Sequence, residues 1–401
     1  MMKTKKVLVS LVIAGMALTM APFNVFADNG VTTTRIFGAD RFGTAVAIAD
    51  AGWTAADTAI LAPATDSDLV CALLAAPLAG KASPILLTDK NTLTAATQAE
   101  LVKLGVKRVY VVGDIDQTVV DQVNSLEGVV ATVLKGVDRT DTAVAIASKL
   151  TNPVGAFVVG YGALPDALSV ASYAAANNYL ILVTNPDGSL PDSEAAYKGS
   201  NVYIIGGPTL VADISGAIRL FGSDRFATNQ AVLGALTYKY DNIYVANGTD
   251  DHLVDSLVAS SLAAASGAPI ILGDTNGSAA AALVHAKLAA NAVITALGGA
   301  SVVPDVVRDE VATGGDASPT TGAQSISIKG FAFSSTELTI KKGDTVTWTN
   351  EDSAVHNVVG GILHSEDLAN GQSFSFTFTE TGTYDYICTH HPSMKGKIIV
   401  N

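Results

Sequence analysis

The chain has 401 residues, of which 49% are hydrophobic and 15% are charged, a composition that can build roughly two to four folded domains and excludes a disordered chain. Its formal net charge is −13, which argues against a nucleic-acid binder and leaves an anionic partner only a local basic patch. The two cysteines, Cys71 and Cys388, are too few for a disulfide framework.

Residues 1–27 have the pattern of a secretory signal peptide. A basic start, Met1–Lys6, precedes the uncharged apolar run Val7–Ala21, and Val25-Phe26-Ala27 places small residues before a cut at Asp28. The apolar run is shorter than the ~20 residues of a membrane-spanning helix, so an uncleaved anchor is the less favoured alternative. We therefore expect a secreted chain with no transmembrane segment in its mature part.

A motif of the form Gly-x-Asp-Arg occurs three times, each time before a Thr- and Ala-rich segment. The copies are residues 38–41, 136–139 and 222–225. Each apolar segment favours a helix with the motif's aspartate as N-cap, namely Asp40, Asp138 and Asp224. The arginines have two open interpretations, a structural ion pair or a bidentate contact with a phosphate or carboxylate.

Further landmarks follow each copy of the motif. Asp166 and Asp255 each begin an Asp-x-Leu sequence in a helix-like segment, and Cys71 stands at this position in the first copy. Apolar runs expected to be buried parallel strands come next, at 84–88, 180–184 and 269–272, and strands running into glycine follow at 109–113, 202–207 and 293–299. This alternation predicts βα units with parallel sheets. We expect Cys71 to be a buried small residue, with a reactive thiol as the alternative.

The three motifs together resemble the clostridial type-2 cell-wall-binding repeat family, with repeats at 28–132, 133–216 and 217–312. The resemblance implies three α/β units in a pseudo-threefold arrangement and non-covalent binding of an anionic secondary cell-wall polymer. The expected polymer contacts are arginines, namely Arg35, Arg41, Arg139, Arg219 and Arg225. The chain departs from the family pattern at Cys71, and at Val133, which stands where Arg35 and Arg219 do, with Lys135 nearby. Either change is expected to weaken one of three equivalent sites.

The pattern changes after a Gly-, Thr- and Ser-rich segment at 313–324, which is typical of a flexible linker. Residues 325–401 alternate apolar and polar side chains in short runs separated by turn residues. Examples are Val346-Thr347-Trp348-Thr349 and Phe374-Ser375-Phe376-Thr377-Phe378. This period of two predicts a small all-β sandwich.

Soft and imidazole side chains gather near the end of this segment. Cys388 is followed by His391 three residues later and by Met394 six residues later, while His356 lies 32 residues before the cysteine. Two imidazoles and a thiolate with a weak axial methionine are the ligands of a blue-copper electron-transfer site. Zinc is the alternative metal, but methionine is a poor zinc ligand. His390 competes with His391 for the ligand position and is expected to be solvated instead, as His364 is expected to lie on an exposed loop.

Four segments resemble the plastocyanin family of cupredoxins and, within it, the amicyanin type with its short ligand loop. They are residues 343–348, 355–358, 382–388 and 391–397. The resemblance implies one mononuclear copper ion held by His356, Cys388, His391 and Met394. It also implies that Asn357 bonds the thiolate and ties the two ligand segments together.

These expectations combine into a cell-surface protein that is anchored to a wall polymer and passes single electrons to an unidentified redox partner protein. The chain offers one mononuclear ligand set and no further histidine pairs for a multicopper oxidase, so we expect an electron carrier and not an enzyme. Two alternatives stay open at this point. One is copper capture or buffering at the surface, and the other is a structural S-layer or adhesin protein whose cupredoxin fold only recognises a partner.

Overall fold

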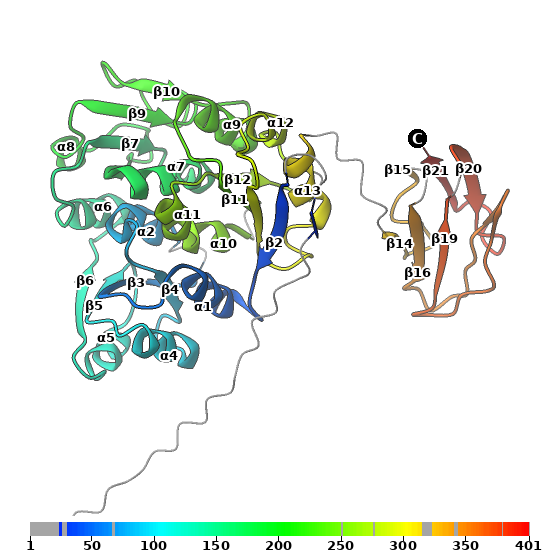
Figure 1. The fold of residues 1–401 in the computed structure, drawn as a ribbon, viewed down its shortest axis with the longest axis horizontal. Helices are drawn as coiled ribbons and strands as arrows, with labels where there is room; N and C mark the ends of the chain where they lie inside the picture. Colours follow the sequence, from blue (N-terminus) through cyan, green and yellow to red (C-terminus); the bar gives the residue numbers. More distant parts are fainter. Residues whose placement is uncertain are drawn as a thin grey trace, which may run out of the picture.

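A computed structural model describes residues 24–25, 30–65, 69–249, 252–275, 277–314, 323–340, 344–378 and 380–400 (Figure 1). The predicted signal peptide lies outside these residues except for β1 (Asn24–Val25), which pairs antiparallel with β2 (Thr32–Ile36). Most of the predicted linker also lies outside them. Within the described chain, no helix combines the length and the apolar character needed to cross a membrane.

The N-terminal region is built from three α/β sheets, whose strands run parallel except for β1. The first has the order β4-β3-β5-β6. Its strands are β3 (Thr58–Pro63), β4 (Ile85–Thr88), β5 (Arg108–Val112) and β6 (Val130–Leu134). Helices α1 (Arg41–Gly52), α4 (Ala95–Lys103) and α5 (Gln117–Asn124) accompany it. Every residue of β4 is buried, which explains why this strand is continuously apolar and does not alternate.

The second sheet has the order β10-β9-β7-β8, and the third has the order β1-β2-β13-β11-β12. The second contains β7 (Gly155–Val159), β8 (Tyr179–Val183), β9 (Asn201–Ile205) and β10 (Ile218–Leu220), with α6 (Arg139–Ala147), α7 (Leu164–Asn177) and α8 (Asp192–Ala195). The third contains β11 (Asn242–Asn247), β12 (Ile270–Gly273) and β13 (Val293–Leu297), with α9 (Arg225–Ala235), α10 (Leu253–Val258), α11 (Ser260–Ser266), α12 (Ala281–His285) and α13 (Asp305–Thr313).

Each sheet takes one strand from the repeat that follows it. β6 and β10, which come just before the second and third Gly-x-Asp-Arg motifs, pair with β5 and β9 of the preceding repeat. The strand before the first motif, β2, pairs in parallel with β13 of the last repeat. The three units therefore close into a ring, and the repeat boundary expected at 132/133 falls inside β6.

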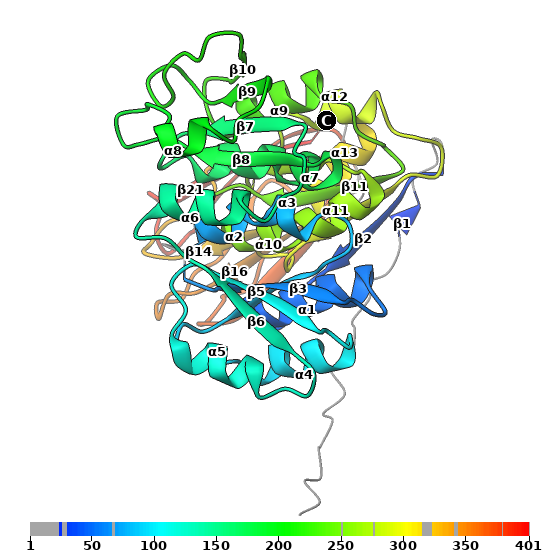
Figure 2. The same cartoon turned by 90° about the vertical axis from the view of Figure 1, so that its left-hand side faces the viewer.

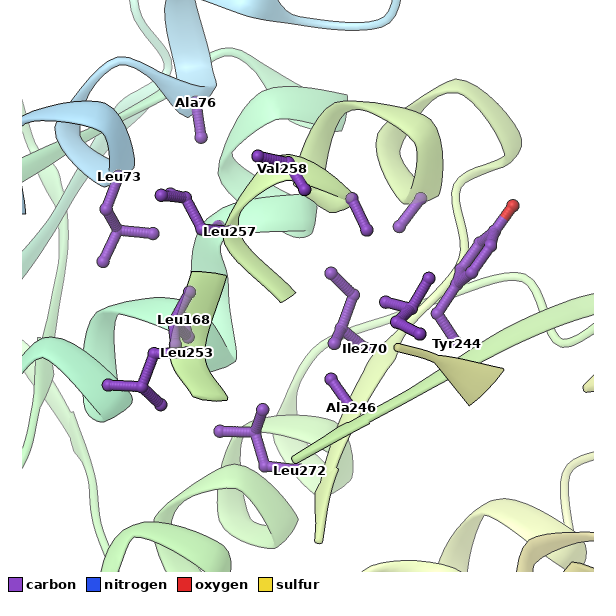
Figure 3. Close-up of a cluster of buried hydrophobic side chains, with 14 of the residues drawn as sticks. Leu73, Ala76, Leu168, Tyr244, Ala246, Leu253, Leu257, Val258, Ile270 and Leu272 are labelled. Carbon is purple, nitrogen blue, oxygen red and sulfur yellow. The ribbon is translucent and has the colours of Figure 1, made fainter. Parts of the chain in front are cut away.

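The centre of the ring is helical. α2 (Leu69–Leu74) and α3 (Ala76–Ala79) of the first repeat, α7 of the second, and α10 and α11 of the third pack on one another. The leucine of each Asp-x-Leu or Cys-x-Leu sequence, namely Leu73, Leu168 and Leu257, is at most 1% exposed, and all three belong to one cluster (Figure 3). Figure 2 shows this helical centre between the sheet that contains β7 and the sheet that contains β3. The Ala-rich sequences of these helices permit their close approach.

The C-terminal module is a two-sheet β-sandwich, as the period of two predicts. One sheet has the order β14-β16-β19 and the other β15-β21-β20-β17-β18. The strands are β14 (Ala323–Ile328), β15 (Glu337–Ile340), β16 (Thr345–Asn350), β17 (Val359–Gly360), β18 (Leu363–His364), β19 (Ser373–Thr377), β20 (Gly382–Ile387) and β21 (Lys395–Val400). Trp348, Phe378 and Tyr386 fill its core, each at most 2% exposed. The outward residues of β16 and β19 pair through their hydroxyl groups, as between Thr347 and Ser375.

Candidate metal centre and repeat junctions

Two segments of the β-sandwich supply the candidate metal ligands. His356 lies between β16 and β17, and Cys388 directly follows β20. The turn after Cys388 closes on itself, because the His391 amide donates to the Cys388 carbonyl oxygen at 3.1 Å and the Met394 amide donates to the His391 carbonyl oxygen at 2.9 Å. The Cys388 amide in turn donates to the Met394 carbonyl oxygen at 3.2 Å. This compact turn brings the side chains of His391 and Met394 close to Cys388.

Three donor atoms converge between these segments. The Cys388 Sγ atom lies 3.6 Å from the Nδ1 atoms of both His356 and His391, and the two Nδ1 atoms lie 3.2 Å apart. The centre of a triangle with these sides lies about 2.0 Å from each corner, which is a normal length for a bond between imidazole nitrogen and a first-row metal. His356 and Cys388 are buried, and His391 is partly exposed. The donor set and its spacing fit one copper ion in a trigonal site.

The remaining candidates of this region occupy different surroundings. Met394 is 4% exposed and packs in the same apolar cluster as Cys388. His390 faces away from the three donors, with its Nε2 atom 2.6 Å from Asp367 Oδ1 at the surface. This contact lowers the pKa of the Asp367 carboxyl. His364 is exposed in β18.

Asn357 joins the two ligand segments through the residue after Cys388. Its Oδ1 atom accepts from the Thr389 amide at 2.8 Å, and its Nδ2 atom donates to the Thr389 hydroxyl at 2.8 Å and to Asp367 at 3.2 Å. The tie between segments that the sequence predicts is therefore present. The bond from Asn357 to the thiolate is not among these side-chain contacts.

The carboxylate of Asp352, which the sequence pattern does not indicate as part of the site, contacts the outer ring nitrogen of His356. Asp352 Oδ2 lies 3.1 Å from His356 Nε2, the ring nitrogen opposite the converging Nδ1 atom. The same carboxylate accepts from the backbone amides of Gly330 and Phe331, and these bonds lower its pKa. Burial and the neighbouring His391 lower the pKa of His356. Neutral imidazole is the form that binds metal, so this environment favours ligation.

Phe331 covers the site from a strained backbone position. Its φ angle is +58°, a region that aromatic residues rarely adopt. Hydrogen bonds from the backbone amides of Gly330 and Phe331 to the Asp352 carboxylate hold it there. The Phe331 ring meets the His391 ring edge-on at 4.9 Å between centroids and is itself 54% exposed. In the sequence, the Gly330-Phe331 pair between two strands indicates a turn. It does not indicate that the Phe331 ring will contact His391.

The three Gly-x-Asp-Arg motifs adopt one local structure. Each aspartate caps its helix, with Asp40, Asp138 and Asp224 accepting from the amide three residues ahead at 2.7–2.9 Å, which confirms the N-cap prediction. The glycine amide of each motif donates to the threonine hydroxyl at the start of the helix. A Cβ atom on Gly38 would lie 2.1 Å from backbone of the helix, so this position requires glycine.

Each arginine of the motif reaches the end of a strand of its own repeat. Arg41 donates to the Ala64 carbonyl oxygen, Arg139 to that of Tyr161 at 2.8 Å, and Arg225 to that of Gly248 at 2.9 Å. Arg41 lines a groove between repeats with Asp255, Gly298 and Gly299, which belong to the third repeat. Arg139 lines the corresponding groove with Cys71 and Gly113 of the first repeat. The motif of one repeat thus meets the Asp-x-Leu position and the glycine turn of the repeat before it.

Two of these junctions hold a buried carboxyl. Burial raises the pKa of Asp255 to about 6, although His252 and Arg41 oppose the shift. Burial likewise raises the pKa of Asp166 to about 6, against a bond from Thr228 and the charge of Arg225. Cys71 is 7% exposed at the third such position, as the sequence predicts.

Arg35 and Arg219 hold the exchanged strands in place. Arg35 is 5% exposed and donates to the carbonyl oxygens of Gly298 and Val303, both at 2.7 Å, and to Asp305 at 2.8 Å. Arg219 makes the same three kinds of contact, with Gly206, Val211 and Asp213. In β6 the position equivalent to Arg35 and Arg219 is occupied by Val133, which pairs with Val111. These contacts use most of the guanidinium donors for closing the ring.

Comparison with known families matches both parts of the chain. Residues 35–122, 133–214 and 219–308 match the family described as "Cell wall binding domain 2 (CWB2)". Residues 320–401 match "Copper binding proteins, plastocyanin/azurin family".

Individual relatives match one part of the chain or the other. "Amidase enhancer" of Bacillus subtilis is 30% identical over 72% of this chain, which spans 41% of that protein. "Amicyanin" of Paracoccus denitrificans is 45% identical over 20% of this chain and 66% of its own length. Among solved structures, Cwp8 from Clostridium difficile has a TM-score of 0.64 at 28% identity, covering 70% of this chain and 51% of that one. The chain thus spans only part of the length of these relatives.

Proposed function

Because the chain belongs to the cell wall binding domain 2 family and ends in a copper-binding domain of the plastocyanin type, we propose that it is a secreted electron carrier held on the cell wall. The repeats bind an anionic wall polymer without a covalent link, and the sandwich exchanges single electrons with a separate redox protein. The observation that carries the redox half is the triangle of Nδ1, Nδ1 and Sγ atoms in His356, His391 and Cys388.

In this proposal copper, when bound, supplies a one-electron couple in which thiolate suits the reduced ion and imidazole suits both. His356, Cys388 and His391 would hold the ion through two imidazole nitrogens and a thiolate, and Met394 would add a weakly binding thioether. The compact turn at 388–394 and the Asn357–Thr389 bonds fix the ligands before the metal arrives. A site that needs little rearrangement between two oxidation states favours rapid electron exchange.

The exit for electrons in this proposal is the partly exposed ring of His391. An apolar and exposed side chain borders that ring, since Phe331 meets His391 edge-on and is 54% exposed. Such a surface suits a brief encounter with another redox protein, because it can be desolvated without breaking ion pairs.

The anchoring half rests on the family match and on the grooves between repeats. The motif arginines at the three junctions, Arg41, Arg139 and Arg225, are the proposed polymer contacts, since guanidinium binds phosphate and carboxylate in a bidentate manner. Arg35 and Arg219 are assigned to ring closure in place of polymer contact, because their donors already bond carbonyl and carboxylate oxygens of the preceding repeat.

The experiment is copper loading of the full chain followed by a redox titration. We expect one copper per chain, an intense visible band from thiolate-to-copper charge transfer, and reversible bleaching on reduction. Copper that dissociates within minutes in the presence of a chelator, or that does not cycle, would indicate surface copper buffering. A chain that binds walls but takes up no copper would indicate a structural or adhesive role. The control is Cys388→Ser, which removes the thiolate.

A further inference from the structure

We propose that the junction between the first and second repeats, lined by Arg139, Lys135 and Tyr161, is the principal polymer site and takes a sugar unit that carries an acidic group. This inference rests on the proposed wall anchoring. It reverses the expectation that the cysteine at position 71 weakens this junction.

The three junctions are equivalent in position. A Cβ atom on Gly298 would lie 2.5 Å from Asp255 Oδ2, and one on Gly206 would lie 2.9 Å from Asp166 Oδ2. At the remaining junction a Cβ atom on Gly113 would lie 3.1 Å from the Cβ atom of Cys71. Each side chain therefore packs under the glycine turn of its own repeat, facing the arginine of the next repeat.

The charge at the three junctions differs because of residue 71. Asp255 lines its groove with Arg41, and Asp166 interacts electrostatically with Arg225, so each of these arginines already faces a carboxyl group. Arg139 lines its groove with Cys71. At this junction a cysteine therefore occupies the position under the glycine turn where the other two junctions have a carboxyl group.

Formal charge also distinguishes this groove, which is the less acidic of the two grooves whose lining residues are described. Its acidic residues are Asp114 and Asp138. Asp114 bonds both Lys135 and Lys90, and these bonds lower its pKa to about 2. Asp138 is the N-cap of α6 and also accepts from the Thr140 hydroxyl. In the groove of Arg41 the acids are Asp40 and Asp255, and the basic residues are Arg41 and His252.

An aromatic ring distinguishes this junction independently of charge. The carbonyl that accepts from the motif arginine belongs to Ala64 and Gly248 at the other junctions and to Tyr161 here. The Arg139 guanidinium lies 5.0 Å from the centre of the Tyr161 ring, and Val137, which is 96% exposed, forms part of the same groove. A cation beside an aromatic face and an apolar rim matches a sugar ring that bears an acidic substituent.

The test compares single variants of the full chain in sedimentation with isolated Gram-positive cell walls. We expect Arg139→Gln to weaken binding by at least about tenfold, while Arg41→Gln and Arg225→Gln, at the two secondary junctions, weaken it by a smaller factor of up to about threefold. Cys71→Asp, which copies the other two junctions, should weaken binding by about tenfold, and Cys71→Ser should not. Copper colour and circular dichroism verify that each variant is folded.

Equal effects of the three arginine variants, or full binding by Cys71→Asp, would overturn this inference and leave wall anchoring intact. Failure of the wild-type chain to bind walls would overturn the anchoring proposal itself. Walls with amidated carboxyl groups and walls stripped of phosphodiester-linked polymer by cold hydrofluoric acid distinguish the two possible acidic groups. Loss of binding to one of them identifies a carboxylate or a phosphate, and unchanged binding to both would contradict an anionic ligand.

Discussion

At the scale of single residues, the candidate metal centre depends on which imidazole nitrogen faces the cysteine. His356 and His391 both turn Nδ1 toward Cys388, and His390 turns its ring toward Asp367. The geometry therefore separates two adjacent histidines that the sequence spacing alone cannot separate.

This difference yields a first prediction. His391→Ala should open the copper site and slow electron exchange, whereas His390→Ala, its neighbour and matched control, should leave the visible band unchanged. Cys388→Ser should abolish the band and keep the sandwich folded, because oxygen cannot supply the thiolate transition. Absorption spectroscopy of copper-loaded variants checks all three. A band lost in His390→Ala and retained in His391→Ala would contradict the ligand assignment.

Asp352 yields a second prediction, because it holds both the ring of His356 and the backbone of Phe331. Asp352→Asn should lower copper affinity by about 10- to 100-fold, the usual effect of losing a partner that orients a ligand. Chelator competition measures this. Asp367→Asn, which removes the charge beside the non-ligand His390 and keeps an oxygen that can accept from Asn357, is the control and should have little effect. Equal losses in both variants would indicate a general charge effect.

At the scale of elements, ring closure rests on strands donated from one repeat to the sheet of another. Arg35 fixes β2 to the turn after β13 with bonds to two carbonyl oxygens and a carboxylate. Val133 has the same register in β6, yet it is 45% exposed. The same structural position is therefore occupied by a buried arginine that bonds the preceding repeat at one junction, and by an exposed valine at another.

A third prediction follows from this contrast. Arg35→Met should destabilise the repeats by about 2–4 kcal/mol, since buried carbonyl groups lose their donors. Val133→Ala should cost less than about 1 kcal/mol at an exposed position. Circular dichroism at the helical band reports on the repeats alone, because all the described helices lie before residue 314. A small effect of Arg35→Met would show that strand pairing closes the ring without the clamp.

A fourth prediction concerns the pH dependence of the repeats. Glu194 in α8 is fully buried, its Oε2 atom accepts from the Val183 amide, and burial raises its pKa from 4.5 to about 8. Between pH 4.5 and about pH 8, Glu194 stays protonated in the folded chain and is ionised in the unfolded chain. Stability from this group is therefore complete below pH 4.5 and falls as pH rises toward 8, by at most about 1.4 kcal/mol per pH unit.

Glu194→Gln should remove this contribution to the slope and make the variant more stable than the wild type at pH 8. Chemical denaturation at several pH values, followed by circular dichroism, measures it. Glu127→Gln, at an exposed position, is the matched control and should leave the slope unchanged. A wild-type slope that survives in Glu194→Gln would show that the carboxyl is ionised when folded.

At the scale of the whole molecule, the sequence predicts the two modules and their fold classes because both have strong periodic signals. Three copies of one motif indicate three α/β units, and alternating side chains indicate the sandwich. It does not predict which sheet receives the strand before each motif, since β2, β6 and β10 could pair within their own repeats or with their neighbours. The structure shows that each of these strands pairs with the preceding repeat, and that β2 closes the ring by pairing with β13.

The same limit applies to the sites. The spacing of Cys388, His391 and Met394 in one turn is local, so a sequence can reveal it. Asp352 and Phe331 come from two turns, and Tyr161, just after β7, packs against Arg139 at the start of α6, so these contacts depend on tertiary packing. Arginine chemistry alone also could not separate Arg35, a clamp, from Arg139, which lines a groove.

The proposed function requires one chain to keep a redox-active copper on the cell wall, and a single sedimentation experiment examines both parts. Copper-loaded full chain is mixed with isolated Gram-positive walls, the walls are sedimented, and the visible band of the pellet is followed through reduction by ascorbate and reoxidation by ferricyanide. We expect the colour to sediment with the walls, to bleach on reduction and to return on reoxidation over repeated cycles. Colour that stays in the supernatant, or a pellet that never bleaches, would contradict it.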